Sequence, residues 1–93
     1  MTITYTAQFK RDYKRIKKQN KALDKLKVLI EKLASEEKLE PHYKDHPLAG
    51  EFKGYRDCHI EPDWLLIYKK TKDNLILVRT GLSWFSGKWN FSL

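Results

Sequence analysis

The segment FKGYRDCHIEPDWLLIYKKTKDNLILVRT, residues 52–80, decides the fold, because three strand-forming runs in it are separated by short turn sequences. The runs are residues 52–60, 64–69 and 75–80, and the turns are Glu61-Pro62-Asp63 and Thr71-Lys72-Asp73-Asn74. Turns this short join antiparallel neighbours, so we predict three antiparallel strands. Gly54 inside the first run predicts a bulge.

The N-terminal third predicts one more strand and then a helix. Residues 2–6 alternate apolar side chains with threonines, as a short strand does. Thr6 is a suitable cap for a helix in which Phe9, Tyr13 and Ile16 share one face, with lysines and arginines on the other.

A second helix follows the break at Gln19-Asn20, with Asn20 as its predicted cap. Its apolar residues recur at helical spacing up to about Ser35, and they are Leu23, Leu26, Ile30 and Leu33. The short connection makes the two helices an antiparallel pair. Residues 36–50 are polar and contain two prolines, so we expect a loop long enough to carry function.

These elements give the order β-α-α-β-β-β in one domain, residues 1–93. We therefore predict an α+β fold in which a small, twisted, mainly antiparallel sheet carries the two helices on one face.

The net charge of +7 is concentrated near the N-terminus. Residues 1–27 contain nine basic and two acidic side chains, whereas the remaining chain is balanced. A one-signed surface favours a polyanion such as RNA or an acidic protein partner, although it could also be a solubilising helix face. The candidate basic patch consists of Lys10, Arg11, Lys14, Arg15, Lys17 and Lys18.

A cytoplasmic location is expected from the cysteine content and the apolar pattern. The single cysteine, Cys58, excludes an internal disulfide and favours a reducing compartment. There is no recognisable signal peptide, and no segment approaches the about 20 apolar residues of a membrane span.

Histidines and aspartates that could transfer protons are concentrated between residues 43 and 68. Strand alternation places Asp57 and His59 on one face, where a carboxylate can orient an imidazole and raise its pKa. His46 precedes the strand and Asp63 follows it, so we expect all four side chains at one end of the sheet.

Such a cluster suits RNA cleavage by the neighbouring 2′-hydroxyl, which needs a base, an acid and cations but no cofactor. The candidate phosphate-binding cations are Lys44, Lys53, Arg56 and Arg79. Trp84 and Phe85 are candidates to hold an unstacked base.

Each candidate also has a structural interpretation. His46 could bond to backbone in a loop, His59 could be a half-buried histidine, and Asp57 could simply pair with a lysine or arginine. Asp63 after Pro62 is a common turn residue. A metal site is disfavoured, because neither His42 with His46 nor Cys58 with His59 has a zinc-ligand spacing.

Three motifs resemble one protein family. KDHPLAG (44–50), FKGYRDCHIEPDWLLIY (52–68) and LVRTG (77–81) resemble the YafQ-like branch of the RelE/ParE toxins of bacterial toxin–antitoxin pairs. The resemblance covers residues 3–81. The ParE-like branch, whose members act on gyrase, matches the histidine-containing segment less well.

The resemblance implies a ribosome-dependent mRNA endonuclease that enters the ribosomal A site. It also implies a DinJ/RelB-like antitoxin, and binding to operator DNA only through the toxin–antitoxin complex. By position, the family's functional residues correspond to His46, Asp57, His59 and Asp63, and the basic N-terminal helices would suit ribosomal RNA.

Ser83 departs from the family pattern. The family has a histidine there, thought to donate or accept a proton, and a serine cannot be a general acid near neutral pH. The alternative to an active nuclease is therefore a weakened or inactive toxin that still binds antitoxin and ribosome.

Overall fold

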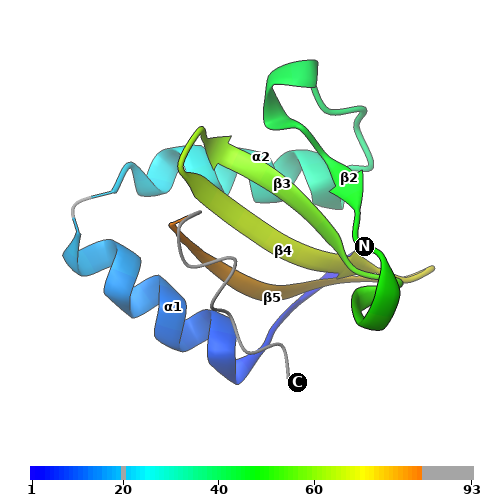
Figure 1. Ribbon diagram of the computed structural model, residues 1–93, viewed down its shortest axis with the longest axis horizontal. Coiled ribbons are helices and arrows are strands. Elements are labelled where there is room, and N and C mark those ends of the chain that lie inside the picture. The colour runs from blue at the N-terminus through cyan, green and yellow to red at the C-terminus, as the bar shows by residue number, and fades with distance from the viewer. Residues whose placement is uncertain (20, 83–93) are drawn as a thin grey trace.

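The computed structural model describes residues 1–19 and 21–82, in which five strands form one sheet in the order β1-β5-β4-β3-β2. The strands are β1 (Thr2–Tyr5), β2 (His46–Pro47), β3 (Arg56–Glu61), β4 (Trp64–Lys70) and β5 (Asn74–Leu82). β1 runs parallel to β5, and every other pair is antiparallel. The predicted α+β class and mainly antiparallel sheet are confirmed (Figure 1).

Two helices, α1 (Ala7–Lys18) and α2 (Leu23–Ala34), pack on one side of this sheet (Figure 1). Thr6 caps α1 as predicted, because its hydroxyl accepts a hydrogen bond from the Phe9 N–H at 3.0 Å. The same hydroxyl donates to the Val78 carbonyl at 2.9 Å, which fixes the start of α1 against β5.

The predicted cap of α2, Asn20, is wrong, because α2 starts later and its cap position is Ala22, without a side-chain bond. Lys21 N–H still bonds the Ile16 carbonyl at 3.5 Å, so the chain reversal continues to Ala22 before α2 begins. The predicted end near Ser35 is confirmed, since Ser35 is the C-cap residue.

The segment from residue 36 to 55 is more structured than predicted. It contains two 3₁₀ turns, Pro41–Tyr43 and Gly50–Phe52, and the short strand β2 between them. The predicted start of the next strand at Phe52 is wrong, because Phe52 ends a 3₁₀ turn and β3 begins at Arg56. Gly54 has φ +99° in the turn before β3, so it serves a turn and not a bulge inside the strand.

The sheet has a buried cluster on each face. On the helix side, Phe9, Ile16, Leu26, Leu29 and Leu33 pack against strand residues that include Cys58, Trp64, Leu66 and Tyr68. On the opposite side a smaller cluster forms around Leu65, Ile67 and Val78, with Leu48, Tyr55 and Ile76 packed against it. We call this second side the far face. Among the helices of the described residues, neither is long and apolar enough to cross a membrane.

Candidate functional site

His46, Asp57 and His59 come together on the far face. Strand β2 places His46 directly opposite Asp57 on β3, and His59 lies two residues further along the same strand face. The His46 Nε2 atom is 3.9 Å from Asp57 Oδ2. His46 is half exposed, at 52% of its side chain, whereas Asp57 is exposed by only 14%. The predicted alternation therefore holds: Cys58 and Ile60 belong to the helix-side core.

Asp57 is held in an unfavourable environment for a carboxylate. Its Oδ1 atom is buried and has no hydrogen-bond partner within the described part of the chain. Burial raises the pKa of Asp57 above its ordinary value, and the nearby imidazoles of His46 and His59 oppose that rise. No lysine or arginine of the described residues pairs with Asp57, so the structure does not support an interpretation in which Asp57 only forms an ion pair with such a residue. A half-buried carboxylate with an unsatisfied oxygen is typical of a functional site.

The hydrogen bonds of the two histidines define which ring nitrogen can exchange a proton. His46 Nδ1 lies 2.8 Å from the Lys44 carbonyl, and His59 Nδ1 lies 3.2 Å from the Pro62 carbonyl. Because a carbonyl oxygen only accepts hydrogen bonds, each Nδ1 must carry hydrogen. Each Nε2 is then the atom that gains or loses a proton, and that of His46 is directed at Asp57.

Asp63 does not join this cluster. It lies in the turn between β3 and β4, and its carboxylate is 4.0 Å from Lys21 Nζ in the connection between the helices. The structure thus brings together three of the four acid–base candidates and directs the fourth toward the helix side.

Two predicted phosphate-binding arginines are already bound to aspartates. Arg56 donates to both carboxylate oxygens of Asp45, at 3.3 Å from Nε and 3.1 Å from Nη2, and this bonding raises the pKa of Arg56. Arg79 likewise donates to both oxygens of Asp12 at 3.1 Å. Lys44 and Lys53 are exposed. Ser83, Trp84 and Phe85 lie outside the described residues.

Asp45 is a residue whose role sequence reasoning missed. Its carboxylate also accepts a hydrogen bond from the Tyr68 hydroxyl, so three donor groups on β3 and β4 hold the residue that immediately precedes His46. Asp45 therefore fixes the chain that enters β2. Its partners are 11 and 23 residues away in sequence, and no local motif indicates them.

Lys69 is a far-face cation that the strand alternation could have revealed. Lys69 shares its face of β4 with Ile67, which is the partner of Asp57 in β3. Its ammonium lies 5.4 Å from the centre of the Tyr55 ring, a cation–π distance. Lys69 thus adds a positive charge on the face that carries Asp57.

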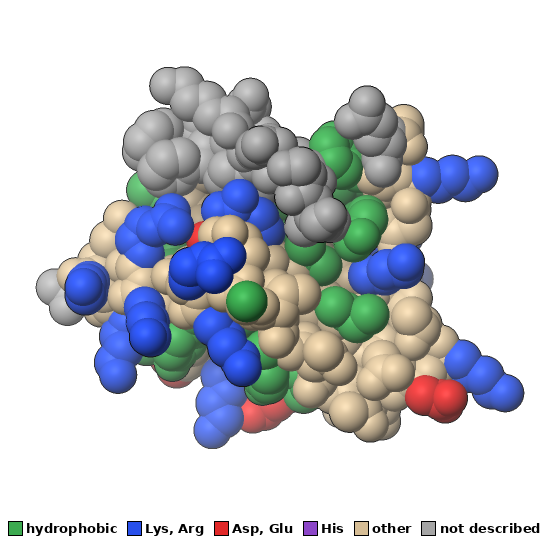
Figure 2. Space-filling view, turned by 90° about the horizontal axis from the view of Figure 1, so that it is seen from below, with side chains coloured by type: hydrophobic (Ala, Val, Ile, Leu, Met, Phe, Trp, Pro, Cys, Tyr) green, Lys and Arg blue, Asp and Glu red, His purple; other side chains and the backbone are tan. Residues whose placement is uncertain are grey.

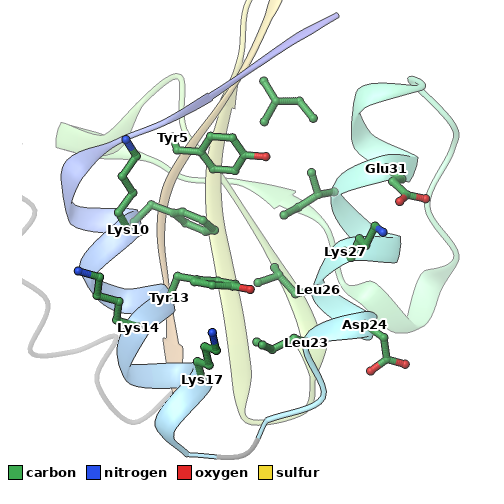
Figure 3. A pocket seen from close by; sticks show the side chains of 13 residues that line it. Tyr5, Lys10, Tyr13, Lys14, Lys17, Leu23, Asp24, Leu26, Lys27 and Glu31 are labelled. Carbon is green, nitrogen blue, oxygen red and sulfur yellow. The ribbon is translucent and has the colours of Figure 1, made fainter.

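The basic residues of α1 form two stripes. Figure 2 shows lysine and arginine side chains gathered over this part of the surface. One stripe is Lys10, Lys14 and Lys17, which line a groove between the helices (Figure 3). The other stripe is Arg11, Arg15 and Lys18. Each of these residues directly follows a member of the first stripe in sequence, which places it about 100° further around the helix axis.

The described residues contain no group of three or more His, Cys, Asp or Glu side chains arranged to hold a metal ion. The chemistry that the far-face cluster offers by itself is proton transfer between imidazole, carboxylate and substrate.

The comparisons with known proteins agree with one another. The model of the family described as "Bacterial toxin of type II toxin-antitoxin system, YafQ" matches residues 1–83. The chain is 49% identical over 80 residues to the mRNA interferase toxin YafQ of Escherichia coli K12, covering 85% of this chain and 87% of that protein.

Solved structures give the same result. The crystal structure of YafQ from E. coli BL21(DE3) matches with a TM-score of 0.86 and 44% identity, over 95% of this chain and 97% of that one. The toxin of the E. coli DinJ–YafQ complex matches with a TM-score of 0.84 and 44% identity, with the same coverage. The chain therefore belongs to the YafQ family of bacterial toxins of type II toxin–antitoxin systems.

Proposed function

We propose that this chain is a ribosome-dependent mRNA endonuclease that cuts its substrate by metal-independent acid–base catalysis. The observation that carries the proposal is the far-face cluster, in which Asp57 stands beside two imidazoles whose Nε2 atoms can exchange protons. The E. coli relative named mRNA interferase toxin supports the same activity.

In this mechanism one imidazole Nε2 removes the proton of the 2′-hydroxyl, which attacks the adjacent phosphorus. The other imidazole, protonated, donates a proton to the leaving 5′ oxygen, so a cyclic phosphate and a free 5′-hydroxyl result. Asp57 orients the neighbouring imidazole. Lys44, Lys53 and Lys69 supply positive charge for the phosphate, and Arg56 and Arg79 contribute less because aspartates already bind them.

The proposed partners follow from the family. A DinJ-like antitoxin would hold the toxin inactive, as the DinJ–YafQ complex supports, and operator DNA would be contacted only through that complex. The basic residues of α1 would bind ribosomal RNA in the A site, and the cytoplasm would be the place of action.

The direct test is a translating extract to which the purified chain is added, with cleavage sites mapped by primer extension. If the proposal is correct, the mRNA is cut at positions linked to codons. Absence of such cuts at any protein level, in an extract that translates normally, would contradict it.

We expect His46→Ala and His59→Ala each to slow cleavage about 100-fold, because each removes one proton-transfer group. Both side chains are at least partly exposed, and within the described residues their hydrogen bonds go to backbone carbonyls, so the melting temperature should change little. Primer extension and thermal unfolding of the same preparations provide the two readouts. A large fall in melting temperature for both variants would assign them a structural role instead.

A second candidate function is a toxin that binds antitoxin and ribosome without appreciable cleavage, and it is favoured by Ser83 in the family's histidine position. If the missing imidazole is the defect, Ser83→His should raise the cleavage rate about 100-fold, within the range typical of acid–base groups. The assay compares both chains in one extract, with Ser83→Ala as the control. An unchanged rate for Ser83→His would mean that proton transfer at this position does not limit cleavage.

A further inference from the structure

The strand that carries His46 is weakly held by its own backbone. β2 is two residues long, lies at the edge of the sheet, and both of its residues are exposed. Its second residue, Pro47, has no N–H to donate to the neighbouring strand. A segment with so few contacts of its own moves easily unless residues beside it are anchored.

Asp45, the residue just before His46, provides such an anchor. Its carboxylate accepts two hydrogen bonds from Arg56, at 3.3 and 3.1 Å, and a third from the Tyr68 hydroxyl. Tyr68 belongs to the buried cluster on the helix side, so Asp45 is attached to the packed core while His46 stays on the far face. We call Asp45, Arg56 and Tyr68 the Asp45 clamp.

The two donors of the Asp45 clamp keep their hydrogens around neutral pH. Burial raises the pKa of the Tyr68 hydroxyl above its ordinary value, and the hydrogen bond to Asp45 raises it further. The hydrogen bond to Asp45 also raises the pKa of Arg56. Both groups therefore continue to donate to the carboxylate over the pH range in which an imidazole transfers protons.

The residue before the clamp has a strained backbone. Lys44 has φ +50° and ψ 39°, in the left-handed region that residues other than glycine rarely adopt. Such a conformation persists only where the surrounding structure holds it. The Lys44 N–H bonds the Pro41 carbonyl at 3.0 Å on one side, and the clamp holds Asp45 on the other. From this turn the Lys44 carbonyl lies 2.8 Å from His46 Nδ1.

We propose that Asp45 is a positioning residue for His46, an inference that rests on the proposed function. The clamp keeps the Lys44 carbonyl against Nδ1, so hydrogen stays on Nδ1 and Nε2 remains the atom that exchanges a proton with the substrate. Without the carboxylate, Lys44 can leave its strained conformation, and the His46 ring can then turn or change tautomer. Arg56 accordingly serves the imidazole through Asp45 and not the scissile phosphate.

The first test measures the effect of the clamp on cleavage. Asp45→Asn keeps the shape of the side chain but replaces one acceptor oxygen by a nitrogen that cannot accept from Arg56 or Tyr68. We expect the cleavage rate at saturating toxin to fall roughly 10- to 100-fold, as when a catalytic group is misplaced. The toxin concentration that gives half the maximal rate should change little. The parent chain is the wild type or Ser83→His, whichever cleaves faster.

A double-mutant cycle distinguishes positioning from a general loss of structure. In a chain that already carries His46→Ala, Asp45→Asn should slow cleavage by less than about twofold, because the imidazole that it positions is gone. Arg56→Lys keeps the charge but loses the two-bond contact with the carboxylate, so it should show the same pattern. Equal slowing with and without His46, or no slowing by either clamp variant, would overturn the proposal.

Glu40→Gln is the matched control. It makes the same change from carboxylate to amide in the same segment of the chain, and it breaks a bond to Lys32 that lies outside the clamp. Because the Lys32–Glu40 pair is exposed, the cleavage rate should stay within about twofold of the parent.

Nuclear magnetic resonance of the ring nitrogens gives a readout that needs no cleavage. About two pH units above the ordinary histidine pKa of about 6.5, wild-type His46 should carry its hydrogen on Nδ1, whereas a free histidine side chain prefers Nε2. The spectrum of His46→Ala identifies the His46 signals among those of the three histidines. Asp45→Asn should shift His46 toward the form with hydrogen on Nε2, and Glu40→Gln should not. An unchanged tautomer in Asp45→Asn would overturn the proposal.

The two readouts separate this inference from the proposed function. If neither the wild type nor Ser83→His cuts the message at codon-linked positions, the proposed nuclease function fails. The His46 tautomer in Asp45→Asn then decides by itself whether Asp45 positions the imidazole.

Discussion

Asp57→Asn is expected to slow mRNA cleavage about 1000-fold while making the folded chain more stable at pH 7. The loss of activity follows because Asp57 lies beside both imidazoles, so its removal takes away the carboxylate that orients them. The gain in stability follows because asparagine has the same shape and avoids burying a charge whose Oδ1 atom has no partner within the described residues.

The stability gain should depend on pH in a defined direction. The pKa of Asp57 is raised in the folded state, so ionisation opposes folding at pH values above it. We expect the variant to exceed the wild type by about 1 kcal/mol in unfolding free energy at pH 7. The difference should shrink as the pH falls and vanish below the unperturbed carboxyl pKa of 3.8, where both chains are neutral at this position.

Urea unfolding at pH 7 and near pH 3.5, together with primer extension, measures both effects. The extension assay uses the wild-type chain or the Ser83→His chain, whichever cleaves faster. Asp63→Asn is the matched control, because that carboxylate is exposed and directed toward Lys21, so we expect small changes in both readouts. A fall in stability for Asp57→Asn at pH 7 would show that the carboxylate is structural, and an unchanged cleavage rate would remove it from the mechanism.

Asp12→Ala should destabilise the fold by about 3–5 kcal/mol, the usual result of removing one partner from a buried ion pair. Asp12 is fully buried on α1 and accepts hydrogen bonds from Arg79, from Arg15, from Gln8 and from the backbone N–H of Thr80. The substitution removes a carboxylate that binds the Arg79 side chain, which is only 13% exposed, and deprives a buried N–H of its acceptor.

Thermal and urea unfolding provide the measurement, and for a domain of this size each kcal/mol corresponds to about 4–8 °C in melting temperature. Asp24→Ala serves as the control, because Asp24 is an exposed residue in the first turn of α2 and should cost less than about 1 kcal/mol. If Asp12→Ala unfolds within 1 kcal/mol of the wild type, the network around Asp12 does not hold α1 to β5.

Sequence reasoning predicted the elements whose signals are local. The helical repeat of Phe9 and Ile16 and the capping hydroxyl of Thr6 both act within one or two turns, and α1 formed as expected. The short turn after Glu61 likewise fixes its hairpin. β2 was missed because a two-residue strand containing Pro47 carries no periodicity, and it exists only by pairing with β3.

The part of the candidate site that was predicted also depends on local sequence signals. The alternation of Asp57 and His59 is a local property, and the His46–Asp57 pairing follows once β2 is placed. The pairing of Arg79 with Asp12 was not predictable from the neighbouring sequence, because the two residues are 67 positions apart. One signal was available: Asp12 lies three residues after Phe9 and four before Ile16, so an acidic side chain occupies the buried stripe of α1.

The separation of the groove from the acid–base cluster by the thickness of the sheet has an evolutionary consequence. Substitutions in the Lys10, Lys14 and Lys17 stripe change the charge of the helix-side groove without disturbing Asp57 or its histidines. Duplicated copies of such a chain in one genome could therefore diverge in what they bind on the helix side while keeping the same acid–base cluster.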